Sequence, residues 1–289
     1  MMDRDTFETR LFGVLRWVVL GLLAVATLFP FAYMVLLSVR PVEDLLRDPG
    51  ALWTGFSEWT VSTYADVLRP AEDGGQGMLA LLGNSALVSF GTVAATLLVS
   101  IPGAYALTRL RFFGRRQIHA LFLAVYLFPS VLLAVPLFVL FTKLGLRDSL
   151  AGLAIVYIAQ TVPVSIYLLR NYLATIPESV EEAAAIDGCT RRQILWRVTL
   201  PLAGPAIMAT GLYVFMIAWN EFLFALLFLV EDRTRWTVSL GLAQLSNGVE
   251  VPKTVLMAGS VVLTVPIVIL FYAAQRMLTE GLTSGAEKT

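Results

Sequence analysis

The sequence predicts an all-α integral membrane protein with six transmembrane helices. Three observations carry this prediction: the composition, the lengths of the apolar segments and the placement of the arginines. Of the 289 residues, 57% are hydrophobic and only 15% are charged, whereas soluble domains carry about 25% charged residues. The formal net charge is zero, which predicts no nucleic-acid partner.

Six apolar segments are long enough to cross a bilayer, which takes about 20 residues in a helix. They are residues 17–39, 84–107, 119–141, 150–169, 203–230 and 255–277. The first could be a signal peptide, but its apolar run is too long and no small-residue cleavage site follows it, so we expect a retained helix. Prolines within the spans are consistent with kinked helices around a cavity or with ordinary helix packing; they are Pro102, Pro129, Pro136, Pro163 and Pro266.

The arginines predict the orientation. Residues 108–116 hold four arginines, and so does the connection between the fourth and fifth spans. With six spans, these two connections and both termini share one side, which the positive-inside rule places in the cytoplasm. The mainly acidic residues 40–83 are then outside. Because aromatic residues are interleaved there, among them Trp53, Phe56 and Trp59, we favour a solvated loop anchored at the membrane interface. A surface for an extracytoplasmic partner is compatible with this interpretation.

A polar stretch, residues 181–201, separates the fourth and fifth spans and is predicted to form two short helices with a turn between them. Gly188 stands where a helix C-terminus favours glycine, and Thr190 with Gln193 has the spacing of an N-terminal capping box. Pro201 is expected to end the second helix. The stretch is either an amphipathic helix on the membrane surface or a docking element for a cytoplasmic partner. The acidic and small residues ahead of Gly188 favour docking.

Catalytic and metal-binding patterns are missing from the sequence. One histidine and one cysteine, His119 and Cys189, cannot supply a metal-ligand cluster or an intramolecular disulfide. Residues 281–289 faintly resemble a phosphate-binding loop, but Glu287 interrupts the spacing and no helix follows. We therefore expect a non-catalytic chain that binds no metal and no cofactor.

Glu221 is the one carboxylate inside an apolar span, and intramembrane acids are candidates for function. It could line a polar cavity with Asn220, or it could bond to a neighbouring helix near the interface, and we favour the structural role. Asn220, Glu221 and Gln160 are the candidate residues of a substrate path.

The polar stretch also carries a resemblance. It reads Glu182-Ala183-Ala184-x-x-Asp187-Gly188, followed by Leu200-Pro201, and it resembles the signature of the inner-membrane permease subunits of binding-protein-dependent ABC importers. Three further segments are similar to the carbohydrate group of that family, specifically to the second permease subunit of maltose-type transporters. They are residues 219–222 (Trp-Asn-Glu-Phe), residues 235–242 and the tail 281–288, where Glu287 departs slightly from the family's ending.

The resemblance covers nearly the whole chain and implies a type I ABC importer permease fold. The permease domain would span residues 77–276, between an N-terminal part, 1–76, and a tail, 277–289. The protein would be a multi-pass component of a bacterial or archaeal plasma (inner) membrane with both termini in the cytoplasm.

The resemblance also implies partners. A coupling helix at about residues 177–200 would dock on a separate ATPase, which binds ATP and Mg²⁺. The docking residues would be Glu182, Ala183, Ala184, Asp187, Gly188 and Pro201. Gly281, Gly285 and Lys288 would also contact the ATPase, and residues 231–252 a sugar-binding protein. The complex would hold a second permease, two ATPase subunits, the extracytoplasmic sugar-binding protein and membrane lipid.

The implied substrate is a di- or oligosaccharide, such as a maltose- or trehalose-type glucan, with glycerol phosphate as another solute of the same group. Two other functions stay open. A secondary carrier would show proton or sodium dependence and have no ATPase partner. A membrane-embedded enzyme would need a catalytic constellation, which the sequence does not contain.

Overall fold

The computed structural model of the chain describes residues 4–43, 59–247 and 251–286. Every regular element in these ranges is helical, which confirms the all-α prediction. Trp53, Phe56 and Lys288, which the sequence analysis singled out, lie outside the described residues. Two compact units make up the chain: Met1–Gly77 with Leu245–Val262, and Met78–Gln244 with Leu263–Thr289.

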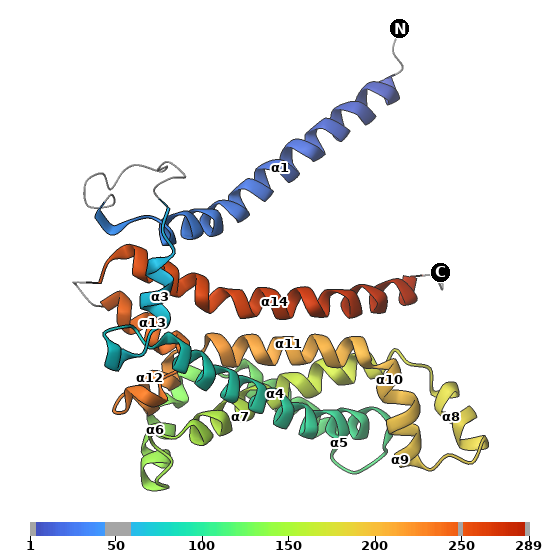
Figure 1. Cartoon of the computed structure of the whole chain (residues 1–289). Coiled ribbons are helices and arrows are strands. Elements are labelled where there is room, and N and C mark those ends of the chain that lie inside the picture. The colour runs from blue at the N-terminus through green and yellow to red at the C-terminus, as the bar shows by residue number, and fades with distance from the viewer. Residues whose placement is uncertain (1–3, 44–58, 248–250, 287–289) are drawn as a thin grey trace. The chain divides into compact units, whose positions relative to one another are not determined.

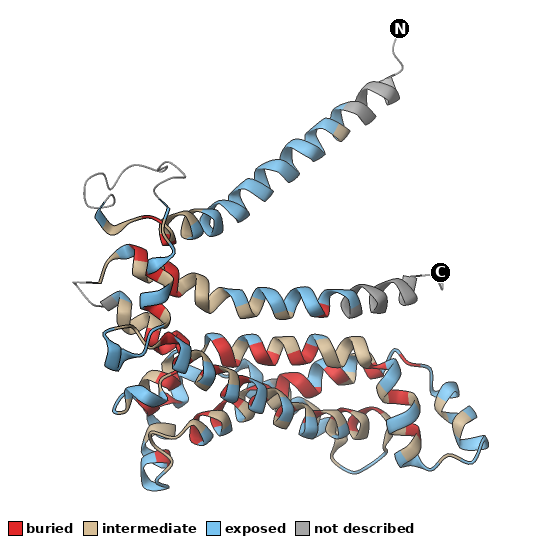
Figure 2. Ribbon diagram, viewed as in Figure 1, coloured by how far each residue is buried: buried red, intermediate tan, exposed pale blue. Residues whose placement is uncertain are grey.

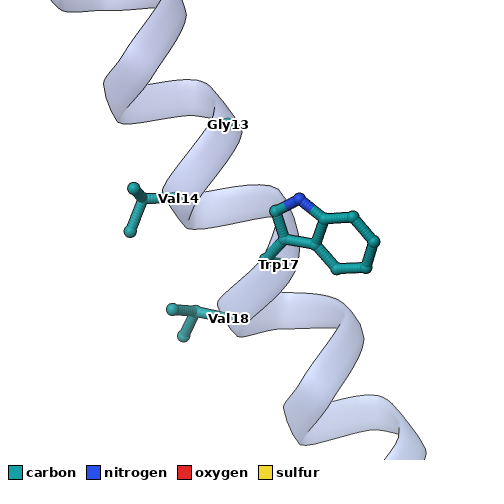
Figure 3. A pocket seen from close by; sticks show the side chains of 4 residues that line it. All are labelled: Gly13, Val14, Trp17 and Val18. Atoms are coloured by element: carbon teal, nitrogen blue, oxygen red, sulfur yellow. The ribbon is translucent and has the colours of Figure 1, made fainter.

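The first unit contains a long apolar helix, α1 (Arg4–Ser38). In Figure 2 its described side chains are mostly exposed, apart from those in the last turns. Figure 3 shows a hollow on its surface between Gly13, Val14, Trp17 and Val18, where Trp17 is 72% exposed. A helix that is apolar on all sides and has no packed protein face is typical of a membrane span.

Two short helices complete the described N-terminal part of this unit, α3 (Ser62–Leu68) and η2 (Ala71–Asp73). The hydroxyls of Ser38 and Tyr64 are 2.6 Å apart, and the N–H of Thr60 donates to the carbonyl of Val39 at 2.8 Å. These two hydrogen bonds attach the α3 segment to the C-terminal end of α1.

The second unit is built on three helices that run side by side in Figure 1: α4 (Met78–Arg109), α7 (Leu150–Leu173) and α11 (Gly204–Asn220). Small polar residues of α4 recur every three or four positions and are all buried. Small side chains allow helix backbones to approach closely within a membrane, and Thr96 and Thr161 form a hydroxyl–hydroxyl hydrogen bond of 2.9 Å between α4 and α7. The buried stripe comprises Ser85, Ser89, Thr92, Thr96 and Ser100.

The third predicted span is not one helix. α5 (Arg115–Leu127) is followed by η3 (Ser130–Leu133) and α6 (Ala134–Lys143), and the two halves meet at 87°. The break falls at Phe128 and Pro129, both of which have extended backbones. Proline disfavours the helical conformation in the residue before it, so Pro129 explains why the helix ends at Leu127.

The fifth predicted span, residues 203–230, is also broken. α11 ends at Asn220, the backbone of Glu221 is extended, and α12 (Leu223–Leu229) follows as a separate helix. η5 (Arg233–Arg235), α13 (Val238–Asn247) and α14 (Lys253–Ala286) complete the chain.

Within the described residues, four helices are long and apolar enough to cross a membrane, and there are up to six spans if each of two bent helix pairs counts as one. The four are Leu11–Ser38, Met78–Arg109, Leu150–Leu173 and Lys253–Arg276. The structure therefore supports a multi-pass membrane protein with four to six spans.

The second unit has two distinct ends. At one end, Arg109 of α4 pairs with Glu181, and Arg170 of α7 contacts His119 of α5. The two arginine-rich connections therefore share an end, as predicted. At the opposite end, Arg147 pairs with Glu231, which joins the α6–α7 connection to the segment after α12.

Candidate functional site

The short helix α8 (Glu178–Ile186) ends in a left-handed turn at Gly188, where φ is +88°. The N–H of Cys189 donates to the carbonyl of Ala184 at 3.0 Å, and the N–H of Gly188 donates to that of Ala185 at 3.0 Å. This pair of bonds is the Schellman motif, which satisfies the last carbonyls of a helix. The prediction that this helix ends at Gly188 is confirmed.

A second helix begins at Thr190, as predicted. The Thr190 hydroxyl accepts a hydrogen bond from the N–H of Gln193 at 3.4 Å, and Gln193 Oε1 accepts one from the N–H of Thr190 at 2.8 Å. This reciprocal pair is a capping box, which satisfies two backbone donors at the start of α9 (Arg191–Ile194).

Pro201 does not end this second helix, so that prediction is wrong. The helical backbone continues through a π-helical turn, η4 (Leu195–Thr199), and through α10 (Leu200–Leu202). In a regular helix the proline ring would clash with the carbonyl four residues back. The wider π turn, in which the N–H of Leu200 bonds to the carbonyl of Leu195, accommodates the ring. The chain then bends by 75° into α11.

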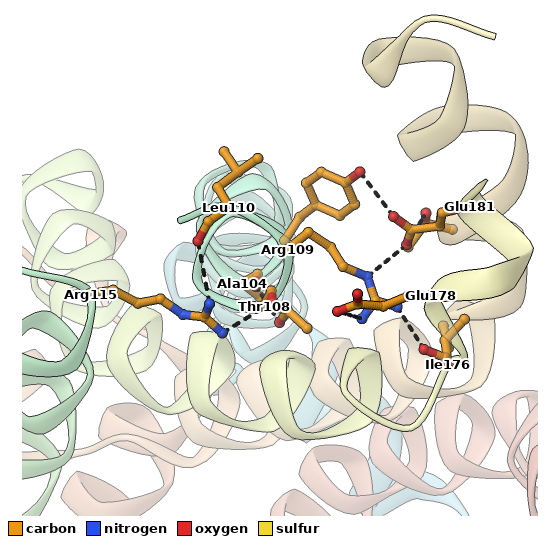
Figure 4. A network of polar contacts seen from close by, with 10 residues as sticks. Ala104, Thr108, Arg109, Leu110, Arg115, Ile176, Glu178 and Glu181 are labelled. Atoms are coloured by element: carbon orange, nitrogen blue, oxygen red, sulfur yellow. Dashed lines mark hydrogen bonds and ion pairs between the residues drawn. The ribbon is translucent and has the colours of Figure 1, made fainter. Parts of the chain in front are cut away.

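Glu181 of α8 joins three side chains from two other elements (Figure 4). It accepts hydrogen bonds from Arg109 Nε at 2.9 Å, from the Tyr105 hydroxyl at 3.2 Å and from the Thr199 hydroxyl at 3.0 Å. The side chains of Arg109 and Glu181 are only 9% and 12% exposed. Arg109 Nη2 also donates to the carbonyl of Ile176 at 2.7 Å. This charge-assisted network fixes α8 to the end of α4 and to η4.

The opposite side of α8 is an exposed face with no partner among the described residues. Ile186 is 86% exposed, although isoleucine is among the residue types most often buried. Of the predicted docking residues, Ala184 is half-buried, and Pro201 is exposed on α10 rather than on α8. The α8 face comprises Glu182, Ala183, Ile186, Asp187 and Gly188.

Sequence analysis missed five residues of this site: Glu181, Arg109, Tyr105, Thr199 and Ile186. In the sequence, Glu181 is one of two adjacent acids and Arg109 is one of four arginines in its segment. The two residues are 72 positions apart, so no local sequence pattern links them. Ile186 had a usable signal, because it is a large apolar residue one turn beyond Glu182 in an otherwise polar and small-residue segment.

At position 188 we expect the left-handed backbone conformation to require glycine, and not a lack of space for a side chain. A Cβ added there would meet nothing within 4 Å, whereas a left-handed conformation costs an L-residue about 1–2 kcal/mol, with asparagine tolerated better than alanine. Gly188→Asn should therefore destabilise the protein less than Gly188→Ala, despite its larger side chain. Melting temperatures of the two variants decide this; a lower melting temperature for Gly188→Asn would show that space, and not backbone conformation, sets the limit.

Glu221 caps a helix. Its carboxylate accepts hydrogen bonds from the N–H groups of Phe224 at 2.8 Å and Ala225 at 3.2 Å, at the start of α12, and from the Tyr157 hydroxyl at 2.5 Å. The Ser239 hydroxyl donates to its carbonyl at 2.6 Å. These contacts explain why a carboxylate is present in this apolar segment, and they support a structural role for Glu221.

Gln160 borders a cavity of 390 Å³ between α5, α7 and α11. Its Nε2 is buried and has no hydrogen-bond partner among the described residues. Tyr126 and Tyr213 also line the cavity, whereas Asn220 and Glu221 do not. Asn220 is exposed and its side-chain amide donates to the carbonyl of Met216 at 2.9 Å. The structure therefore does not gather the three candidate substrate-path residues in one cavity.

The remaining predicted contact segments lie in η5, α13 and the end of α14. Asp232 is the N-cap residue of η5, and hydrogen bonds from the hydroxyl and then from the N–H of Thr234 lower the pKa of its carboxyl. Gly281 and Gly285 belong to α14, and residues 248–250 and Lys288 are outside the described ranges. In the part of the chain that the structure describes, no group of three or more His, Cys, Asp and Glu side chains is arranged to hold a metal ion.

Comparisons with known proteins agree with this architecture. Residues 97–284 match the family model of the binding-protein-dependent transport system inner membrane component. The inner membrane ABC transporter permease protein YcjP of Escherichia coli is 37% identical over 269 residues, which cover 93% of this chain and 94% of that protein. The trehalose/maltose transport system permease protein MalG of Thermococcus litoralis is 37% identical, over 92% of this chain and 94% of its own.

A solved structure aligns over a similar length. It is the crystal structure of a bacterial ABC transporter involved in the import of the acidic polysaccharide alginate. One of its chains gives a TM-score of 0.78 at 26% identity, covering 96% of this chain and 98% of that one.

Proposed function

The chain belongs to the family of inner-membrane components of binding-protein-dependent transport systems, and from this premise we propose that it is a permease subunit of an ATP-driven importer for a di- or oligosaccharide. The family implies an ATPase partner and an extracytoplasmic binding protein. The proposed complex holds two ATPase subunits and a second, different permease. ATP and Mg²⁺ bind to the ATPase, and this chain has no catalytic role.

The observation that carries the proposal is the two-sided character of α8. One side is held by the Glu181–Arg109 network, and the other exposes Glu182 and Ile186 without a partner among the described residues. An exposed apolar side chain next to small residues and carboxylates fits a protein cleft that supplies an apolar pocket and cationic donors. We assign this face to the ATPase.

The geometry suggests how force passes from the ATPase into the membrane. A displacement of α8 acts on Arg109 at the end of α4 and on Thr199 in η4, because both donate to the same carboxylate of Glu181. α4 packs along α7 and α11, so the movement reaches the helices around the cavity. In this mechanism the ATPase drives the chain between inward-facing and outward-facing states.

The substrate class rests on the relatives and on one cavity. One relative is named for trehalose and maltose, and the solved neighbour imports a polysaccharide. The unpaired amide of Gln160 offers a donor to a sugar hydroxyl, and the rings of Tyr126 and Tyr213 offer surfaces for a pyranose. We therefore keep Gln160 as a substrate-path residue, whereas the carboxylate of Glu221 is engaged by α12 and Tyr157.

Six spans are proposed for the membrane topology, with each bent helix pair counted as one crossing and both termini in the cytoplasm. In this arrangement the α8 end of the second unit is cytoplasmic and the η5 end is extracytoplasmic. Gly281, Gly285 and Lys288 of the tail then lie on the side of the ATPase. Residues 231–252 lie on the side of the binding protein.

Reconstitution of the complex in lipid vesicles tests the function. We expect a di- or oligosaccharide, presented on its binding protein, to stimulate ATP hydrolysis, and Gln160→Ala to weaken that stimulation. Gln117→Ala, outside the cavity, is the control. Sugar uptake that follows a proton or sodium gradient without ATP would instead identify a secondary carrier. An ATPase that no carbohydrate stimulates would contradict the sugar assignment and leave the importer assignment in place.

A further inference from the structure

The loop between α4 and α5 forms a cationic hollow of 530 Å³ that the transport mechanism does not use. Arg115 and Arg116 of α5 and Arg170 of α7 line it, with His119 beside them. Among the described residues no carboxylate pairs with any of these three guanidinium groups. Three cations therefore share a small volume without a counter-charge.

Neutral contacts in this hollow orient the guanidinium groups of Arg115 and Arg170 without neutralising them. Arg115 donates to the carbonyls of Thr108 at 3.1 Å and Leu110 at 3.4 Å. Arg170 Nη1 lies 3.2 Å from His119 Nε2, and because a guanidinium can only donate, the histidine nitrogen accepts. Such held guanidinium groups suit the oxygens of a phosphate, which accept paired hydrogen bonds from arginine.

Apolar surface adjoins the charged hollow. Phe113, at its rim, is 100% exposed. Ile118 and Leu121 are 37% and 60% exposed and follow at helical spacing along α5. A ligand that satisfies both parts must carry an anionic phosphate and a long apolar chain.

We propose that this hollow binds one anionic phospholipid, with its phosphate between Arg116 and Arg170 and one acyl chain along the exposed side of α5. Basic pockets between membrane helices are known to hold anionic headgroups. The site lies at the same end of the second unit as α8, so the lipid occupies the leaflet on that side. The inference does not depend on which solute the protein transports.

The test uses the purified full complex in nanodiscs of phosphatidylcholine with or without phosphatidylglycerol, and native mass spectrometry to count retained lipid. We expect phosphatidylglycerol to be retained in preference to phosphatidylcholine. Arg116→Gln with Arg170→Gln should weaken that retention by about a hundredfold, because each of the two lost charge-assisted contacts is worth about tenfold. Lys143→Gln, an exposed cation at the opposite end, should leave retention unchanged.

Two further measurements keep the proposal falsifiable. Phe113→Ser alters a fully exposed side chain, so it should fold normally and still lose phosphatidylglycerol retention. Melting temperatures in pure phosphatidylcholine check that the arginine variants fold. Equal retention of both lipids, or wild-type retention in Phe113→Ser and in the folded arginine variants, would overturn the proposal. So would displacement of the lipid by inorganic phosphate alone, since that result would identify a site for free phosphate.

Discussion

Arg109→Ala is expected to destabilise the protein by about 3–5 kcal/mol, which is the usual cost of removing one partner of a buried ion pair. The substitution leaves the carboxylate of Glu181, which is 12% exposed, without its only cationic partner among the described residues. The carbonyl of Ile176 loses its hydrogen bond from Arg109 as well. The melting temperature of the purified complex should therefore fall clearly, and uptake should be lost because α8 no longer moves with α4.

A double-mutant cycle identifies the cause. Arg109→Ala with Glu181→Ala should be more stable than Arg109→Ala alone, because the double variant leaves no unpaired buried charge. Arg111→Ala, which removes an exposed arginine two positions further along the chain, is the matched control and should be close to wild type. The ATPase should stay bound in all three variants, since the exposed face of α8 is unchanged. Equal destabilisation by Arg109→Ala and Arg111→Ala would refute the buried pair as the joint between α8 and α4.

The parts of the site that the sequence predicted are those encoded within a few residues. Gly188 ends α8, and Thr190 with Gln193 starts α9, because a Schellman turn and a capping box each depend on residues at most five positions apart. The Glu181–Arg109 pair depends instead on the packing of α8 against α4. No local pattern carries that information, so sequence reasoning identified the docking motif and missed the contact that anchors it.

The prolines show why composition alone could not separate bent spans from straight ones. Pro102, Pro163 and Pro266 lie inside continuous helices, whereas Pro129 marks a break. A proline in a membrane helix is tolerated when neighbouring groups satisfy the freed carbonyls, and this depends on tertiary packing. At the break between α11 and α12, the carboxylate of Glu221 caps the start of α12. A hydropathy pattern shows this residue only as one acid in an apolar run.

Ile186→Asp is expected to release the ATPase while leaving the chain itself stable. Ile186 is 86% exposed, so a polar replacement costs the isolated chain little. At a docking interface, a buried apolar anchor contributes about 2 kcal/mol or more, so its loss weakens association by roughly thirtyfold or more. Glu182→Lys should act in the same direction by reversing the charge offered to a cationic cleft. Co-purification of the ATPase with the membrane subunits and ATP-driven uptake are the two measurements.

The control is on the same helix. Ala185→Ser changes an exposed residue one turn beyond Glu181, on the side of α8 away from the proposed docking face, so it should keep the ATPase bound. The contrast with Arg109→Ala then separates two ways of losing transport. Ile186→Asp should detach the ATPase from a complex whose membrane part melts normally, whereas Arg109→Ala should lower the melting temperature with the ATPase still attached. If Ile186→Asp and Glu182→Lys both retain the ATPase at wild-type affinity, the exposed side of α8 is not the docking surface, and the force must enter through another part of this end of the protein.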